Sequence, residues 1–167
     1  MTPLACAGTP SSPPVAMRDG RTTRMSSLPE RRLEDRQYAM MELAYGRKGG
    51  LSSGDGIARL LRSHSSQPLS LLARWIVDRQ IVSFRWRSLL LVPKFQFEPA
   101  GMRPRPTVLD VVNELAPYRD DWDLACWFAQ PNARLEHRAP LDLIDDDPEA
   151  VRRAARADRQ GNEARGA

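Results

Sequence analysis

Residues 104–129 read PRPTVLDVVNELAPYRDDWDLACWFA, and this stretch decides the class of fold. Its first half places apolar residues at the i, i+3, i+4 and i+7 spacing of one helix face: Val108, Val111, Val112 and Leu115. Pro117 stops that helix, and a second helix is predicted from about 121 to 129, with acids at its positive N-terminal end. The rest of the second helix is apolar almost all round, so most of its aromatic side chains are expected to pack in the core.

Two more helices are predicted upstream, between Asp55 and Arg79, in a helix-turn-helix-like layout with residues 63–67 as the turn. Asp55 suits the N-cap of the first helix, and Pro68 is tolerated in the first turn of the second. If residues 67–79 lie in or near the major groove of DNA, four side chains could contact phosphates or bases: Arg59, Arg62, Arg74 and Arg79. A helical pair whose arginines merely face water explains the same pattern, since the second helix is apolar for a recognition helix.

A β-hairpin is predicted after these helices, where the apolar period changes to two. Val82, Phe84 and Trp86 alternate with polar residues, and a second run extends from 89 to 97. Pro93 lies inside the second run and cannot donate a ladder hydrogen bond, so that strand lies at an edge or is broken there. The expected fold class is mainly α with one β-hairpin resting on helices.

Composition divides the chain into four parts. Residues 1–33 are rich in Pro, Ser, Thr, Gly and Arg without an apolar period, which predicts a disordered tail. Residues 34–101 contain a short helix over 34–45, the helix-turn-helix-like region and the hairpin. Residues 102–160 predict a small helical domain whose last helix has Asp147 as cap and Pro148 at its first position, and residues 161–167 predict a frayed C-terminus.

Charge and hydropathy indicate which partners and which cellular compartment the sequence favours. Residues 1–101 carry 15 Lys or Arg against 8 acids, a net charge of +7, whereas residues 102–167 carry 10 against 13, a net charge of −3. A basic front half suits a polyanion, and an acidic back half does not. No apolar run approaches the roughly 18 residues of a membrane span. The N-terminal residues do not resemble a secretory signal, so we expect a cytoplasmic protein with no membrane partner.

The chain lacks the motifs of the common catalytic and cofactor sites: GxxxxGKS or GxxxxGKT, HExxH, GxSxG and GxGxxG. Cys6 and Cys126 form no CxxC pair, and three consecutive acids at 145–147 fit a solvated helix cap better than a cation site. We therefore expect a protein without catalysis, metal or cofactor. A cluster of Trp, Phe and Arg beside the irregular link PNARLEHR, residues 131–138, predicts a protein-binding surface instead.

The run WFAQPNARLEHRAPLDLIDDDPEAVRRAARAD, residues 127–158, resembles the toxin-binding domain of Xre/MbcA/ParS-like antitoxins. That domain combines a tryptophan helix, a Pro-Asn turn, a Pro-Leu-Asp-Leu turn and a closing helix rich in Ala and Val. The preceding run LLVPKFQFEPAGMRPRPTVLDVVNEL, residues 90–115, is similar to the strand and helix found upstream of the domain. The resemblance extends from about Ser53 to Asp158. It departs from the family at 136–139, where many members have Gly before the Pro-Leu-Asp turn.

The resemblance implies an antitoxin that covers the active site of a RES-type toxin, an enzyme that consumes NAD, and it also implies a homodimer and possible binding of operator DNA. The toxin-binding residues that it implies are Trp127, Pro131, Asn132, Leu135, Pro140, Leu141, Asp142 and Leu143. As a separate hypothesis from their charge, the candidate toxin-binding residues of the closing helix are Arg152, Arg153 and Arg156. The arginines of the closing helix could enter or rim a pocket that holds a negatively charged dinucleotide. The alternative function is a DNA-binding transcriptional regulator without a toxin partner.

Overall fold

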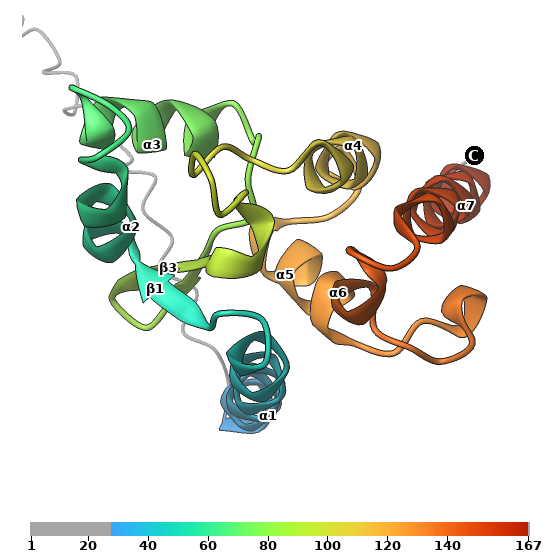
Figure 1. Ribbon diagram of the computed structural model, residues 1–167. Helices are drawn as coiled ribbons and strands as arrows, with labels where there is room; N and C mark the ends of the chain where they lie inside the picture. Colours follow the sequence, from blue (N-terminus) through green and yellow to red (C-terminus); the bar gives the residue numbers. More distant parts are fainter. Residues whose placement is uncertain (1–27, 167) are drawn as a thin grey trace, which may run out of the picture.

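The computed structural model describes the backbone of residues 28–166 and confirms a mainly α fold with a small antiparallel sheet (Figure 1). The elements follow in the order α1 (Leu28–Gly46), β1 (Leu51–Ser53), α2 (Gly54–Leu61), α3 (Pro68–Val77), β2 (Phe84–Trp86), β3 (Leu89–Pro93), η1 (Lys94–Gln96), α4 (Pro106–Leu115), α5 (Asp121–Ala129), η2 (Ala133–Leu135), α6 (Pro140–Leu143) and α7 (Pro148–Gly166).

The larger hydrophobic core is formed by α1, α4, α5, α6 and α7 together with side chains of the sheet. The predicted face of α4 is fully buried and packs against α7, whose own buried residues are Val151, Ala154 and Ala155. Residues 124–129 of α5 are all buried, as their apolar composition predicts. The Tyr45 hydroxyl of α1 donates a buried hydrogen bond to the Ala125 carbonyl at 2.7 Å, which fixes α1 against α5.

The sheet contains the predicted hairpin and one additional strand, in the order β1-β3-β2. The second strand of the hairpin is therefore central, and it is broken at Pro93, where the 3-10 turn η1 begins. Pro93 pairs with Leu51 at the end of β1, so the missing N–H falls where the ladder ends. Sequence periodicity misses β1 because three residues are too few to reveal an alternation.

A smaller core holds α2 and α3 against the sheet, at the opposite end of the molecule from α7 in Figure 1. It consists of Ile57, Ala58, Leu61, Leu72, Trp75, Ile81, Val92 and Phe97. The fully buried side chain of Gln96 lies at the junction with the larger core. Its Oε1 accepts from the Val82 N–H at 2.6 Å, and its Nε2 donates to the carbonyls of Val82 and Pro93, both at 2.8 Å. These bonds satisfy backbone groups that would otherwise be buried without partners.

The helix ends differ from the predictions in three places. Helix α1 begins at Leu28, so residues 28–33 are helical instead of part of a tail, because Pro29 in the first turn favours helix initiation. The rest of the predicted tail, 1–27, lies outside the described residues. Ser53 and not Asp55 caps α2, accepting from the Gly56 N–H at 3.1 Å. Helix α7 continues to Gly166, supported by a hydrogen bond from the Tyr118 hydroxyl to Glu163 at 2.8 Å.

Within residues 28–166, no helix has both the length and the apolar character that crossing a membrane requires.

Candidate protein-binding surface

The link that leads from α5 to α6, residues 131–138, is ordered by its own backbone. The Asn132 side chain accepts from the Arg134 N–H at 2.8 Å and so caps η2. The backbone N–H groups of Asn132 and His137 donate across the link to Arg138 and Asn132, both at 3.0 Å. Leu135 is buried in the larger core, whereas most other side chains of the link are exposed. The link is therefore a compact, exposed loop anchored at its centre.

Glu136 and His137 both adopt the left-handed conformation, with φ of 55° and 61°. Only glycine enters this region without a steric cost from Cβ, and single left-handed residues are usually Gly or Asn. These residues occupy the segment where the family that the chain resembles often has Gly. The backbone at this position thus keeps a glycine-like turn with two side chains exposed on it.

Asp158 of α7 fastens the link to the helices beneath it. Its Oδ2 accepts from Trp127 Nε1 at 2.8 Å and from Asn132 Nδ2 at 3.4 Å, and its Oδ1 accepts from Arg134 Nε at 3.1 Å. One carboxylate therefore joins α5, the link and α7. Sequence reasoning missed this role, although an acid three residues after Ala155, on the buried face of α7, was a signal.

The structure places the residues implied as toxin-binding in two groups. The first group lies in the core and supports the surface from below: Trp127, Leu135, Pro140, Leu141 and Leu143. The second group is exposed or half-buried: Pro131, Asn132, Asp142, Arg152, Arg153 and Arg156. Only the residues of the second group can contact a partner while the core stays closed.

The arginines of α7 differ in how they are held. The Arg152 side chain, 19% exposed, donates to Asp110 at 2.7 Å and to Thr107 at 3.0 Å and also pairs with Glu149. The hydrogen bond to Asp110 is the main reason that the pKa of Arg152 is raised above its ordinary value. Arg156 lies 3.6 Å from Glu114, which also pairs with Arg159 at 2.8 Å.

Arg153 is exposed and has no ion-pair partner among the described residues, in contrast to its neighbours on α7. The guanidiniums of Arg152 and Arg159 hold α7 on α4. Arg153, and Arg156 with its longer contact, are therefore the arginines of α7 best placed to bind another molecule.

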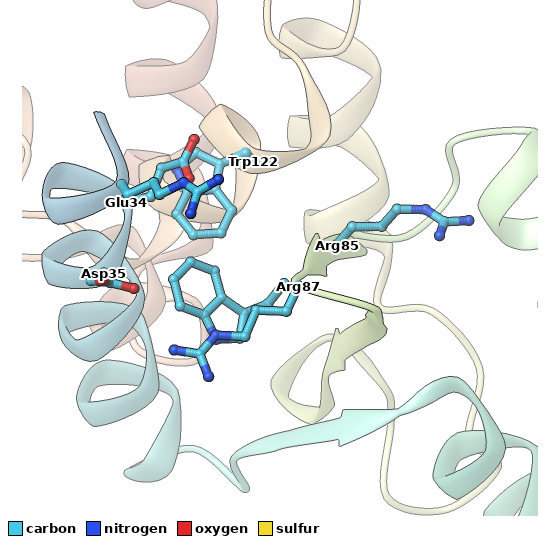
Figure 2. Close-up of a pocket in the computed structure, with 7 residues that line it drawn as sticks. Glu34, Asp35, Arg85, Arg87 and Trp122 are labelled. Carbon is cyan, nitrogen blue, oxygen red and sulfur yellow. The ribbon is translucent and has the colours of Figure 1, made fainter. Parts of the chain in front are cut away.

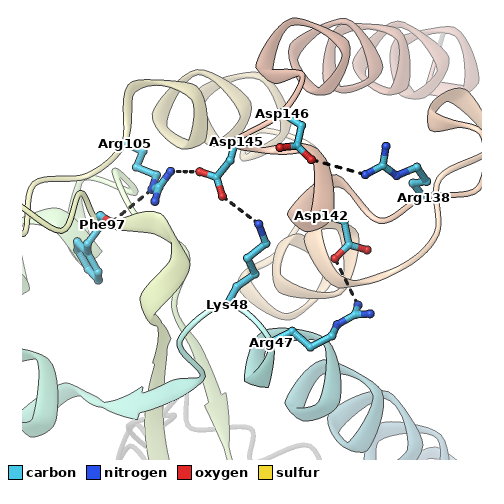
Figure 3. A network of polar contacts seen from close by, with 8 residues as sticks. All are labelled: Arg47, Lys48, Phe97, Arg105, Arg138, Asp142, Asp145 and Asp146. Atoms are coloured by element: carbon cyan, nitrogen blue, oxygen red, sulfur yellow. Dashed lines mark hydrogen bonds and ion pairs between the residues drawn. The ribbon is translucent and has the colours of Figure 1, made fainter.

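An ion-pair network joins the turn after α1 and the N-terminal end of α4 to α6 and the segment after it (Figure 3). Arg47 forms an ion pair with Asp142 at 3.4 Å. Asp145 forms ion pairs with Lys48, at 2.9 Å, and with Arg105. The hydrogen bond from Lys48, with that from Arg105, lowers the pKa of Asp145 below its ordinary value.

The three consecutive acids at 145–147 have three different roles. Asp145 belongs to the network just described, and Asp146 lies 3.9 Å from Arg138 of the link. Asp147 caps α7 as predicted, accepting from the Ala150 N–H at 2.9 Å. The acidic run therefore serves helix capping and ion pairing, and no group of metal-ligating side chains is present in the described part of the chain.

The four arginines predicted to contact DNA are also divided. Arg59, Arg62 and Arg74 are exposed on or next to α2 and α3, and the described residues offer them no ion pair. Arg79 instead donates to the Arg119 carbonyl at 2.9 Å and to Asp121 at 3.1 Å, and it also bonds the Ala116 carbonyl. Its guanidinium closes the C-terminal end of α4, so Arg79 is engaged within the protein.

Comparison with known proteins identifies no relative: the chain matches no family model, no curated protein and no solved structure.

Proposed function

We propose that this chain is an antitoxin-like protein, without catalysis of its own, that binds and neutralises a RES-type NAD-consuming toxin in the cytoplasm. The observation that carries the proposal is the exposed link held by Asp158, which accepts from Trp127, Asn132 and Arg134. A surface loop ordered before binding loses little conformational entropy when a partner docks on it. The order of motifs along residues 127–158 supports the assignment to an antitoxin.

The proposed mechanism is steric and electrostatic blockage. The exposed residues of the link cover the rim of the toxin's active site, and Arg153 and Arg156 point their charge toward a pocket that is shaped for a dinucleotide. The partners of these guanidinium groups are carboxylates or other acceptor groups on the rim of that pocket, because a guanidinium binds such groups with paired hydrogen bonds. The buried residues Trp127, Leu141 and Leu143 contribute by holding the link and α7 in place.

Co-expression with a RES-domain toxin from the same host tests this function. We expect the wild-type chain to restore growth and intracellular NAD, and the double variant Arg153→Glu, Arg156→Glu to lose at least about tenfold in toxin affinity, because two charges are reversed at the interface. Arg62→Glu is the matched control, since it reverses an exposed arginine at the other end of the molecule. Continued loss of NAD with the folded wild-type chain present would contradict the proposal.

The second candidate function is DNA-binding regulation, either alone or beside toxin binding. The specific observation in its favour is that Arg59, Arg62 and Arg74 are exposed without ion pairs among the described residues. Fluorescence anisotropy with DNA from the chain's own promoter region, at several salt concentrations, tests it. Binding that weakens in Arg62→Glu and with added salt supports an operator contact. If a pull-down recovers no toxin, and nuclease treatment removes everything that was bound to the protein, the result favours a DNA-binding regulator without a toxin partner.

The family resemblance also leads us to propose a homodimer. Analytical ultracentrifugation of the full chain measures the mass directly, and a monomer at the concentrations where the toxin is neutralised would exclude a dimer as the active form.

A further inference from the structure

A pocket outside the proposed toxin-binding surface lies between the first turns of α1 and the β2–β3 hairpin (Figure 2). Its volume is about 700 Å³, and its lining combines two indoles with five charged side chains. The volume falls within the range of small-molecule sites, which place a few polar groups around an apolar wall. None of the residues that line the pocket is part of the link or one of the exposed arginines on α2 and α3.

The apolar wall of the pocket is built from stacked aromatic rings. Trp86 stacks on Tyr38 with ring centroids 4.4 Å apart and planes 4° apart, and it stacks on Trp122 at 5.6 Å and 25°. The Trp122 indole N–H donates to Gln37 at 3.0 Å, which fixes its orientation. Both indoles remain only half-buried. The wall is thus rigid before any ligand arrives, and part of its aromatic surface is open.

The charged side chains of the pocket include both signs, and none of them forms an ion pair with any described residue. Arg87 lies over the Trp86 ring at 5.5 Å from its centroid, and Glu34, beside Trp122 in Figure 2, is a half-buried carboxylate. Arg85 points away from both in the same view. This differs from α7, where neighbouring acids satisfy most arginines, so the pocket presents uncommitted donors and acceptors.

We propose that this pocket binds a ribonucleotide, either free or as one unit of a single strand. A base packs against an open aromatic surface, a guanidinium pairs with a phosphate, and carboxylates accept hydrogen bonds from ribose hydroxyls or an exocyclic amine. The exposed part of Trp122 supplies the first interaction, Arg31 and Arg87 the second, and Glu34 and Asp35 the third.

Other ligands match fewer of these groups. A simple anion leaves the two carboxylates unused, and a simple cation leaves the arginines unused. A second copy of this chain fits poorly through the same face, because two concave surfaces placed against each other enclose a void that loses packing contacts. A nucleotide uses the aromatic, basic and acidic groups together, and it is convex enough to enter.

Isothermal titration calorimetry of the full chain with adenosine, guanosine and uridine monophosphates tests the proposal. We expect saturable binding of at least one nucleotide at one site per chain, and binding at least about tenfold weaker for adenosine or inorganic phosphate alone, because each lacks one of the recognised parts. A short single-stranded RNA is titrated in parallel. Tighter binding of the RNA assigns the site to a strand, and equal or weaker binding assigns it to a free nucleotide.

Two pocket variants and one matched control localise the binding. Arg87→Gln removes the guanidinium and is expected to weaken nucleotide binding about tenfold, and Glu34→Gln to weaken it by a smaller factor. Arg103→Gln, at an exposed arginine in the segment between η1 and α4, leaves the affinity unchanged. Far-UV circular dichroism checks that each variant is folded. The proposal is overturned if no nucleotide or RNA binds at concentrations up to about 1 mM, or if both pocket variants bind as tightly as the wild type.

Discussion

The two ends of the molecule use the same type of residue in different ways. On α7, the guanidiniums of Arg152 and Arg159 pair with acids of α4 and hold the two helices together. At the other end, Arg59, Arg62 and Arg74 face outward without ion pairs in the described residues. Both sets lie on or next to amphipathic helices, and for both sets a binding role was one of the interpretations that the sequence allowed. The comparison teaches that an arginine's role depends on whether a facing helix supplies an acid.

The ends also differ in how much apolar surface they bury. The larger core joins five helices and the sheet, whereas the smaller core holds only α2 and α3 with a few residues of neighbouring segments. Segments with fewer buried contacts open at a lower free energy than the rest of a protein. We therefore expect α2 and α3 to open before the α4–α7 end.

The largest effect is expected for Phe128→Ala in the larger core. Phe128 is fully buried and packs on Phe95 and Trp127 at centroid distances of 5.2 and 5.1 Å. Loss of its ring should lower the free energy of unfolding by about 3–5 kcal/mol, as measured by urea denaturation. Leu72→Ala in the smaller core is the comparison variant. If hydrogen exchange shows that Leu72→Ala loosens the whole chain instead of α2 and α3, the two ends are one cooperative unit.

Gln96→Leu tests the junction between the two cores. The substitution keeps much of the side-chain volume but leaves the buried Val82 N–H and two carbonyls without their partner. We expect a loss of about 2–3 kcal/mol in the free energy of unfolding. Ser83→Ala, a buried neighbour with no side-chain hydrogen bond among those described, serves as the control. An unchanged urea midpoint for Gln96→Leu would mean that the junction does not depend on these bonds.

Asp158→Asn should weaken the fastening of the link by about 1–2 kcal/mol, because the charge-assisted bond from Arg134 is lost. The structural readout is faster amide hydrogen exchange in residues 131–138, and the functional one is weaker toxin binding. Asp146→Asn, at an exposed acid 3.9 Å from Arg138, is the matched control. Faster exchange throughout the chain would show that Asp158 supports the whole fold and not the link.

The smallest effect is expected from Asp145, which links Lys48 and Arg105 at the surface. Its pKa is lowered in the folded protein, so the stability it contributes is present above its ordinary pKa of 3.8 and is lost as the pH falls through the folded value. Because the side chain is 41% exposed, we expect only about 0.5 kcal/mol. Acid titration of wild type and Asp145→Asn, followed by circular dichroism, measures the difference. If the acid-unfolding curves of the wild type and Asp145→Asn coincide both above and below pH 3.8, Asp145 makes no such contribution to stability.

Local patterns predicted much of the fold, and long-range partners were the part they could not supply. Apolar spacing and prolines marked α3, α4 and α5, and the change of period marked the hairpin. Strand β1 was missed because three residues carry no readable period. The partners of Arg79 and Trp127 were missed because they lie 42 and 31 residues away, at Asp121 and Asp158. Exposure in the candidate surface likewise depends on which helix covers each residue.

The left-handed pair at Glu136 and His137 limits the sequences that the link can accept as the protein evolves. Branching at Cβ is strongly disfavoured there, whereas Gly, Asn, Asp and His are the residues that reach this conformation most readily. Homologous chains that keep the same loop should therefore avoid Val, Ile and Thr at both positions. Their exposed side chains remain free to vary in charge within that limit, so partner preference could diverge here without a change in backbone shape.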